Sequence, residues 1–140
     1  RTFANDRGFN INETTSSKTK TFNDLITVKL GSDAEYKTIS ATIFGEDDFR
    51  VVDIDGFAIE LRLEGDILIY KNIDKPGMLA AVSSRLSDQS VNIASLSLGR
   101  TEKGSLAVTA VGVDRSLTKE ELDHIESMEG VNDMRYISFK

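Results

Sequence analysis

The sequence predicts an α+β fold in two parts, an antiparallel β-meander followed by a β-α-β-β-α-β unit. Three observations carry this prediction. Before residue 64, short stretches of alternating apolar and polar residues are separated by turn signals, which is typical of paired strands. After residue 66, apolar strands alternate with two stretches of helical periodicity. The turn Glu64-Gly65-Asp66 separates the two patterns, so we expect one domain over residues 1–64 and a second over residues 65–140.

The first part contains four predicted strands, each bounded by turn residues. They cover Leu25–Leu30, Tyr36–Phe44, Phe49–Ile54 and Phe57–Leu63. Apolar and polar residues alternate in the first of them, which predicts a half-buried strand. The pair Asp55-Gly56 between the last two strands is a strong hairpin signal, because both residue types accept the positive φ that a tight turn needs.

The second part predicts four strands and two helices. The strands cover residues 66–71, 91–98, 106–113 and 131–139. One helix begins near Pro76, which suits a first helical turn because its missing N–H costs nothing there. The other follows Thr118, whose pairing with Glu121 predicts a capping box. This split βαβ order predicts a ferredoxin-like, four-stranded antiparallel sheet with both helices on one face.

The composition excludes several classes of function. The 140 residues include no cysteine, which excludes disulfides and thiolate chemistry and fits the cytoplasm. A net charge of −6 argues against nucleic-acid binding, and no apolar run reaches the roughly 20 residues of a membrane span. The single histidine, His124, has no partners for catalysis, so we expect no catalytic residue and no metal site. Because the chain starts at Arg1, we expect a piece of a longer protein.

The junction between the strand ending near Lys71 and the next helix could hold a free amino acid. Such a ligand offers an ammonium, which Asp74 can accept, and a carboxylate, to which backbone N–H groups at the helix start can donate. Asn92 offers both donor and acceptor atoms. The candidate effector residues are Asn72, Asp74, Pro76, Gly77, Met78, Leu79 and Asn92. Asp74 could instead cap the helix and Asn92 brace a turn, and the spacing alone favours that structural interpretation.

The junction segment Asn72–Gly77, together with Val91-Asn92-Ile93-Ala94, resembles the ACT domain family. Members of that family are regulatory modules that bind amino acids, often across a dimer interface. Further upstream, three segments resemble the C-terminal region of long-form D-3-phosphoglycerate dehydrogenases, in which an intervening domain precedes the ACT domain. These segments are Asn5-Asp6-Arg7-Gly8-Phe9, Ala41-Thr42-Ile43-Phe44-Gly45 and Arg50-Val51-Val52-Asp53-Ile54-Asp55-Gly56-Phe57.

The resemblance implies a function for the chain within a larger enzyme. It implies an NAD-dependent oxidoreductase of L-serine biosynthesis as the parent, with its catalytic domains upstream and no cofactor in this chain. L-serine or another small amino acid would be the effector, and the chain would form a homo-oligomer through the ACT domain. Asn92 would then come from the neighbouring subunit. Asn72 stands where serine-binding members often carry histidine or tyrosine.

A possible anion site flanks the predicted hairpin. A two-residue turn would pair Arg50 with Leu61, whereas a three-residue loop would set Arg50 directly opposite Arg62. The resemblance implies a phosphate-bearing ligand at these arginines, although Ala58 replaces a position that is often histidine. The alternative is that nearby carboxylates pair with the arginines on a solvated face, and we favour it. The candidate partners are Glu46, Asp48 and Glu60.

Two other interpretations stay open. The last two-thirds of the chain also resembles the β-type domain of iron–sulfur L-serine dehydratases. The chain could also be an assembly module whose sheets pair edge to edge and which binds no effector. Because the first domain looks truncated, we expect its meander to present an open sheet face or edge.

Overall fold

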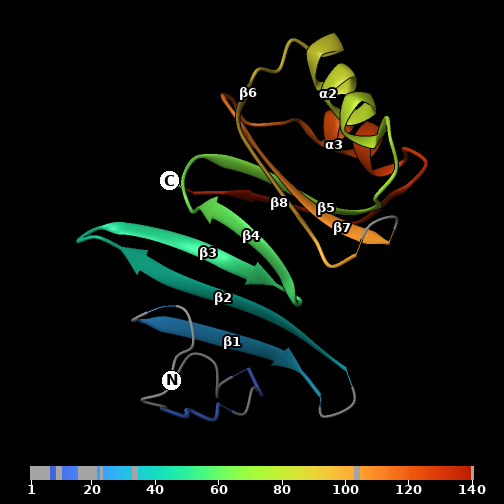
Figure 1. The fold of residues 1–140 in the computed structure, drawn as a ribbon. Coiled ribbons are helices and arrows are strands. Elements are labelled where there is room, and N and C mark those ends of the chain that lie inside the picture. Colours follow the sequence, from blue (N-terminus) through green and yellow to red (C-terminus); the bar gives the residue numbers. More distant parts are fainter. Residues whose placement is uncertain are drawn as a thin grey trace.

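The computed structural model describes residues 7–8, 11–15, 22, 24–32, 35–102 and 105–139. Most of the segment 1–10, which carries one of the resembling motifs, lies outside these residues. Within them, no helix is long and apolar enough to cross a membrane. The described strands form two antiparallel sheets of four strands each, and two helices accompany the second sheet (Figure 1). The predicted α+β meander followed by a ferredoxin-like unit is therefore confirmed.

The first sheet is a simple meander in the order β1-β2-β3-β4. Its strands are β1 (Leu25–Gly31), β2 (Tyr36–Phe44), β3 (Asp48–Ile54) and β4 (Phe57–Arg62). Ile54 pairs with Phe57 across the turn Asp55-Gly56, as the hairpin signal predicted. Both turn residues have positive φ, 53° at Asp55 and 85° at Gly56, which matches the residue types found there.

The second sheet has the order β6-β7-β5-β8. Its elements are β5 (Asp66–Ile73), α2 (Met78–Asp88), β6 (Ile93–Arg100), β7 (Leu106–Val113), α3 (Lys119–Glu126) and β8 (Val131–Ser138). Both helices cover one face of this sheet, and the first sheet lies on the other side (Figure 1). The molecule is thus layered as helices, second sheet and first sheet.

Alternation along β5 and β7 explains why the second sheet is covered on both faces. Leu68 and Tyr70 point to the helices, where they join a core that includes Val82 and Leu86 of α2. Residues at the alternate positions of β5 and β7 point the other way and form a second core with the first sheet. This second core contains Val51, Phe57, Ile59, Leu61, Ile67, Val108 and Ala110. Strands buried on both faces are largely apolar, and β7 accordingly has only one polar side chain, Thr109.

Strand β4 lies unusually close to strand β6. A side chain at Gly99 would collide with the backbone carbonyl oxygen of Ala58, so only glycine allows this approach. One row further along, the amide of Glu60 donates to the hydroxyl of Ser97 at 3.1 Å. The small residues of β6 therefore let the two sheets meet without a backbone pairing between β4 and β6.

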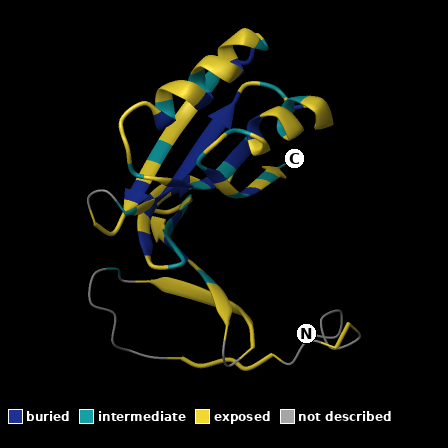
Figure 2. Cartoon of the chain, turned by 90° about the vertical axis from the view of Figure 1, so that its right-hand side faces the viewer, coloured by how far each residue is buried: buried dark blue, intermediate teal, exposed yellow. Residues whose placement is uncertain are grey.

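The prediction that the first strand is half-buried was wrong. Every residue of β1 is exposed, and Ile26 retains 70% of its accessible surface. The alternation itself is present, because Ile26, Val28 and Leu30 share one face of the strand. No described element closes over that face, and Figure 2 shows β1 at the exposed margin of the molecule. Alternation in the sequence identifies which face of a strand is apolar, but it does not show that another element covers that face.

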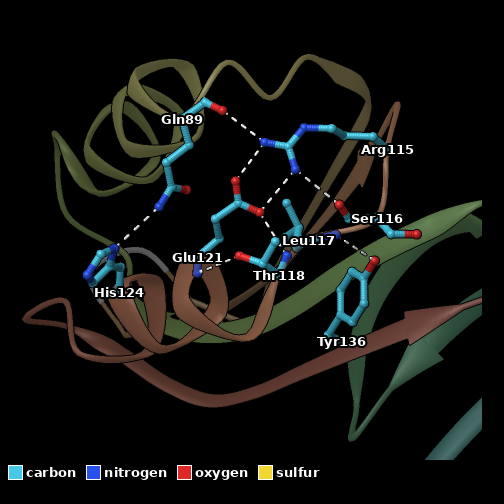
Figure 3. Close-up of polar contacts among 8 residues, drawn as sticks. All are labelled: Gln89, Arg115, Ser116, Leu117, Thr118, Glu121, His124 and Tyr136. Carbon is cyan, nitrogen blue, oxygen red and sulfur yellow. Dashed lines mark hydrogen bonds and ion pairs between the residues drawn. The ribbon is translucent and has the colours of Figure 1, made fainter.

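The predicted capping box at α3 is confirmed, and an arginine reinforces it (Figure 3). Thr118 accepts from the amide of Glu121, and the Glu121 carboxylate accepts from the amide of Thr118. Arg115 donates to both Glu121 oxygens at 3.0 and 2.6 Å, and to the carbonyl of Gln89 at 2.8 Å. The Arg115 hydrogen bond, followed by the Thr118 amide, lowers the pKa of Glu121 to about 2. This cluster ties the start of α3 to the end of α2.

Candidate functional site

The candidate effector residues from Asn72 to Leu79 meet where β5 turns into α2. Strand β5 ends at Ile73, and the amide of Asp74 then donates to the carbonyl of Ser105 at 2.7 Å. The amide of Lys75 turns back to the carbonyl of Ile73 at 2.8 Å. These two bonds fix the turn directly beside the end of β7, so the junction is built on the central strands of the sheet.

Asn72 is buried at this junction, with 4% of its surface exposed. Its amide nitrogen donates to the carbonyl of Ile73 at 2.9 Å, and its amide oxygen accepts from the hydroxyl of Thr109 at 3.1 Å. One amide hydrogen remains for a ligand, because the side chain has two donors. Asn72 therefore shapes the floor of the junction more than it projects from it.

Asp74 lies at the rim, and its carboxylate is already paired. The guanidinium of Arg100, at the end of β6, donates to it at 3.1 Å. The Asp74 side chain retains 21% of its surface, whereas Arg100 retains 55%. A cationic group entering the junction would share this carboxylate with Arg100, and an anionic group would find the guanidinium beside it.

The start of α2 differs from its prediction. Pro76 was expected in the first helical turn, but the N-cap is Gly77 and the helix begins at Met78. Gly77, which follows Pro76, has a φ of 93°. Only glycine adopts this left-handed conformation at little cost. No side chain caps this end, and open space faces Gly77 where a Cβ would stand. Among the described contacts, Asp74 does not cap this helix. The Met78 amide donates to the carbonyl of Lys75 at 3.5 Å, which leaves the amides of Leu79 and Ala80 as the first-turn donors.

The remaining effector residues at the helix start divide between core and surface. Met78 is buried in the helix-side core, and Leu79 is half-buried. Pro76 and Gly77 are exposed. The side chains of Met78 and Leu79 thus anchor the helix, and only their backbone amides could contact a ligand.

Asn92 lies at the opposite end of the sheet in the same chain. It directly precedes the pair Ile93–Val113, whereas Asn72 pairs with Ala107. Six residues along a strand correspond to about 20 Å. The Asn92 amide donates to the carboxylate of Asp114, so it braces a turn within the chain. A single copy does not bring Asn92 to the junction.

The arginines at the hairpin are opposite each other but not free of counter-charges. Arg50 pairs directly with Arg62, because a bulge between Val51 and Asp53 shifts the register despite the two-residue turn. Asp48 accepts from both arginines, and Glu60 accepts from Arg50. Hydrogen bonding to Arg50 lowers the pKa of Asp48 despite some desolvation. An anion here would have to displace these carboxylates.

Sequence reasoning missed two residues at the junction, Arg100 and Thr109. Both face the helix side of the sheet, and both touch a residue that the sequence singled out. The βαββαβ order could have suggested them, because it places β7 beside β5, but the register between these strands could not be known. Among the described residues, no group of histidines and carboxylates could hold a metal ion. The ring of His124 lies 3.5 Å from the side chain of Gln89 (Figure 3).

Comparison with known families agrees with this architecture. The ACT domain model matches residues 67–130, and the model of the D-3-phosphoglycerate dehydrogenase intervening domain matches residues 1–55. The fold and the junction thus define an ACT-type regulatory module preceded by part of a second domain. The order of the two matches places the chain in the C-terminal regulatory region of the D-3-phosphoglycerate dehydrogenase family.

Similar curated proteins are named D-3-phosphoglycerate dehydrogenases. The chain is 28% identical to D-3-phosphoglycerate dehydrogenase of Bacillus subtilis over 134 residues, which is 96% of this chain and 26% of that protein. It is 28% identical to the enzyme of Methanocaldococcus jannaschii over 135 residues, 96% of this chain and 25% of the relative. A chloroplastic enzyme of Arabidopsis thaliana is 35% identical over 81 residues, 58% of this chain and 14% of the relative. The chain thus spans about a quarter of the first two relatives.

Proposed function

We propose that this chain is an effector-binding region that regulates a D-3-phosphoglycerate dehydrogenase, and that its effector is a free amino acid, first of all L-serine. The observation that carries the proposal is that a carboxylate, Asp74, and a helix start without a side-chain cap, at Gly77, lie in the same turn. The two features offer an acceptor for an ammonium and donors for a carboxylate at one junction. A helix N-terminus also favours negative charge through its dipole.

The ligand would replace part of the existing pairing at the rim. Its ammonium would bind the carboxylate of Asp74, and its carboxylate would bind the first-turn amides of α2 and the guanidinium of Arg100. Charge-assisted bonds of this kind are roughly twice as strong as neutral ones. The buried amide of Asn72 would donate its remaining hydrogen to the ligand.

We propose that the site is completed by a second copy of the chain. Strand β6 is an edge strand, and Leu96 and Leu98 on its helix-side face keep 46% and 43% of their surface. Antiparallel pairing of two β6 edges would cover these leucines. It would also place the start of one β6 beside the end of the other, so Asn92 of the second copy would approach Arg100 and Asp74.

The proposal extends to the parent protein through the names of its relatives. The upstream domains would carry the NAD-dependent oxidoreductase activity in L-serine biosynthesis in the cytoplasm, and this chain would contribute no catalytic residue. A domain boundary near Gly65 would separate the intervening unit from the ACT unit. For Arg50 and Arg62 we propose structural ion pairing with Asp48 and Glu60 rather than anion binding.

A second candidate is an assembly module without an effector. The hydrogen bonds of Asn72 and the ion pair of Asp74 favour it, because both side chains already have partners within the chain. This candidate predicts a dimer through β6 that gives no heat with any amino acid. Sedimentation and calorimetry together therefore distinguish the two.

The experiment is isothermal calorimetry of this chain with L-serine, and with glycine and D-serine as controls. Saturable, stereospecific heat is expected. Asp74→Ala and Asn92→Ala should each weaken binding at least about tenfold, since each removes a polar group from the proposed site. Asp88→Ala, an exposed aspartate at the far end of α2, is the matched control and should bind normally.

Two results would count against the proposal. Tight binding that survives in both Asp74→Ala and Asn92→Ala would place the effector elsewhere. A folded dimer without heat for any of the three ligands would favour the assembly module.

A further inference from the structure

A second recess lies between the two sheets, on the side of the second sheet away from the helices. It has a volume of about 290 Å³. Its walls come from both sheets, so an occupant would touch both parts of the chain. The effector junction lies on the helix side, and the two sites are therefore separated by the second sheet itself.

The walls of this inter-sheet cleft are apolar. Val28, Leu30 and Ile39 line it from the first sheet, and Ile69, Val108 and Ile137 line it from the second. Several of these side chains are far from buried: Val28 keeps 54% of its surface, Leu30 60% and Ile39 39%. The same apolar surface that forms the second core near β4 thus continues outward as an open cleft near β1.

Five charged side chains gather at this cleft, and all five belong to its lining. They are Lys37, Asp55, Lys71, Asp133 and Arg135. Lys71 lies 2.7 Å from Asp55 and 3.5 Å from Asp133, while Asp133 also pairs with Lys37 and, at 2.9 Å, with Arg135. Among the described residues that line the cleft, three cations against two carboxylates leave an excess of one positive charge.

The backbone supports this gathering of charge. Asp133 has φ of 47°, a left-handed conformation that is uncommon for residues other than glycine, at an irregularity in the pairing of β8 with β5. That irregularity directs the Asp133 carboxylate to Lys71. Arg135 is the most exposed of the three cations, since 66% of its side-chain surface is accessible.

We propose that this cleft binds a small amphipathic monoanion, an alkyl or arylalkyl carboxylate with an apolar body of about eight carbons. The body would lie between the sheets, and the carboxylate would pair with Arg135 and the excess positive charge. Apolar pockets at domain interfaces, with a few convergent polar groups, are the usual form of small-molecule sites, and about 300 Å³ is the lower end of their size range. The single uncompensated positive charge selects an acid over an amine or an alcohol.

The test uses the whole chain and sodium octanoate as the probe, followed by amide NMR and calorimetry. Octylamine and octanol, which have the same body with a positive or neutral head, are the ligand controls. Octanoate should bind saturably and shift the amides of β1, β5 and β8. Octylamine should bind at least about tenfold more weakly, because its head meets like charge.

Variants locate the site. Val28→Trp fills the cleft from an exposed position and should abolish octanoate binding, whereas Lys29→Trp, on the opposite face of the same strand, should leave it intact. Arg135→Gln should weaken binding about three- to tenfold, and Arg85→Gln on the exposed side of α2 should not. Amide spectra confirm that each variant is folded.

Three results would overturn the inference. The first is no saturable octanoate binding, and the second is equal binding of octylamine. The third is unchanged binding in folded Val28→Trp. If sedimentation shows that a second copy covers β1, and octanoate does not compete with it, the cleft is a contact surface and the proposal fails as well. L-serine binding is not expected to change in any of these variants, so these results do not bear on the effector site.

Discussion

The ammonium of Lys71 lies 2.7 Å from the carboxylate of Asp55, and this contact joins the strand that leads into the effector junction to the hairpin turn of the first sheet. Both side chains are largely covered, with 22% and 16% of their surface exposed. Burial opposes charge on Asp55, but hydrogen bonds from Lys71 and from the amide of Thr38 lower its pKa overall. Burial likewise opposes the charge of Lys71, but Asp55 and Asp133 raise its pKa. Both groups therefore stay charged at neutral pH.

Breaking the Lys71–Asp55 pair should destabilise the chain. Lys71→Met or Asp55→Asn should each lower the free energy of unfolding by about 1–3 kcal/mol, since each leaves a partly buried charge without its main partner. A double-mutant cycle in urea should give a coupling energy of about 1 kcal/mol. Lys75→Met, an exposed lysine in the next turn, is the control. Additive single effects would mean that the pair contributes nothing.

Substituting Gly99 should force the sheets apart. Gly99→Ala places a methyl group against the Ala58 carbonyl, which is backbone and cannot turn away, so a loss of about 1–3 kcal/mol is expected from overpacking. Gly112→Ala meets the hydroxyl of Ser95, which can rotate, and should cost less. Thermal unfolding of the two variants compares them directly. Equal losses would show that backbone contact between β4 and β6 does not limit the packing.

Acid should weaken the contacts of Glu121 with Arg115 and Thr118 at the start of α3. The pKa of Glu121 falls from 4.5 to about 2 in the folded chain, so its ionised form is stabilised by folding. That contribution is complete above pH 4.5 and is lost as the pH falls toward 2. Glu121→Gln should therefore be less stable at neutral pH, and the difference from the parent chain should shrink across this range in urea titrations. Glu120→Gln, a neighbour that no described contact ties to Arg115, should show no such convergence.

Removing the hydroxyl of Thr109 should leave the amide oxygen of buried Asn72 unsatisfied. Thr109→Val keeps the shape and should cost about 1–3 kcal/mol, the desolvation penalty of an unpaired buried acceptor. Thr109→Ser retains the donor and should recover most of that loss. Denaturant unfolding measures both. If the serine variant is as unstable as the valine variant, the methyl group rather than the hydrogen bond matters at this position.

Local patterns predicted most of the fold. The bounds of β2 and β7, the hairpin at Asp55-Gly56 and the capping box at Thr118 were all predicted from short-range signals. These features depend on residues only a few positions apart, whose chemistry fixes the local backbone. The start of α2 was misplaced, because proline before glycine permits a turn as readily as a first helical turn.

Contacts between residues far apart in the sequence could not be predicted from it. The pairing of Asp74 with Arg100, and of Asn72 with Thr109, depends on strand register and on which strand lies in the middle of the sheet. The exposure of β1 depends on what packs over it, which its own alternation does not encode. The arginine pair was left open for the same reason, since the bulge between Val51 and Asp53 decided the register.

The layering has a further consequence for how β5 can vary in length. Lys71 and Asn72 are consecutive, and because strand side chains alternate, one faces the first sheet and the other faces the helices. Inserting or deleting a single residue within β5 would exchange the two faces and present an ammonium to the helix-side core. Homologous chains should therefore keep the length of this strand constant and place their insertions in turns, such as residues 45–47 and 55–56.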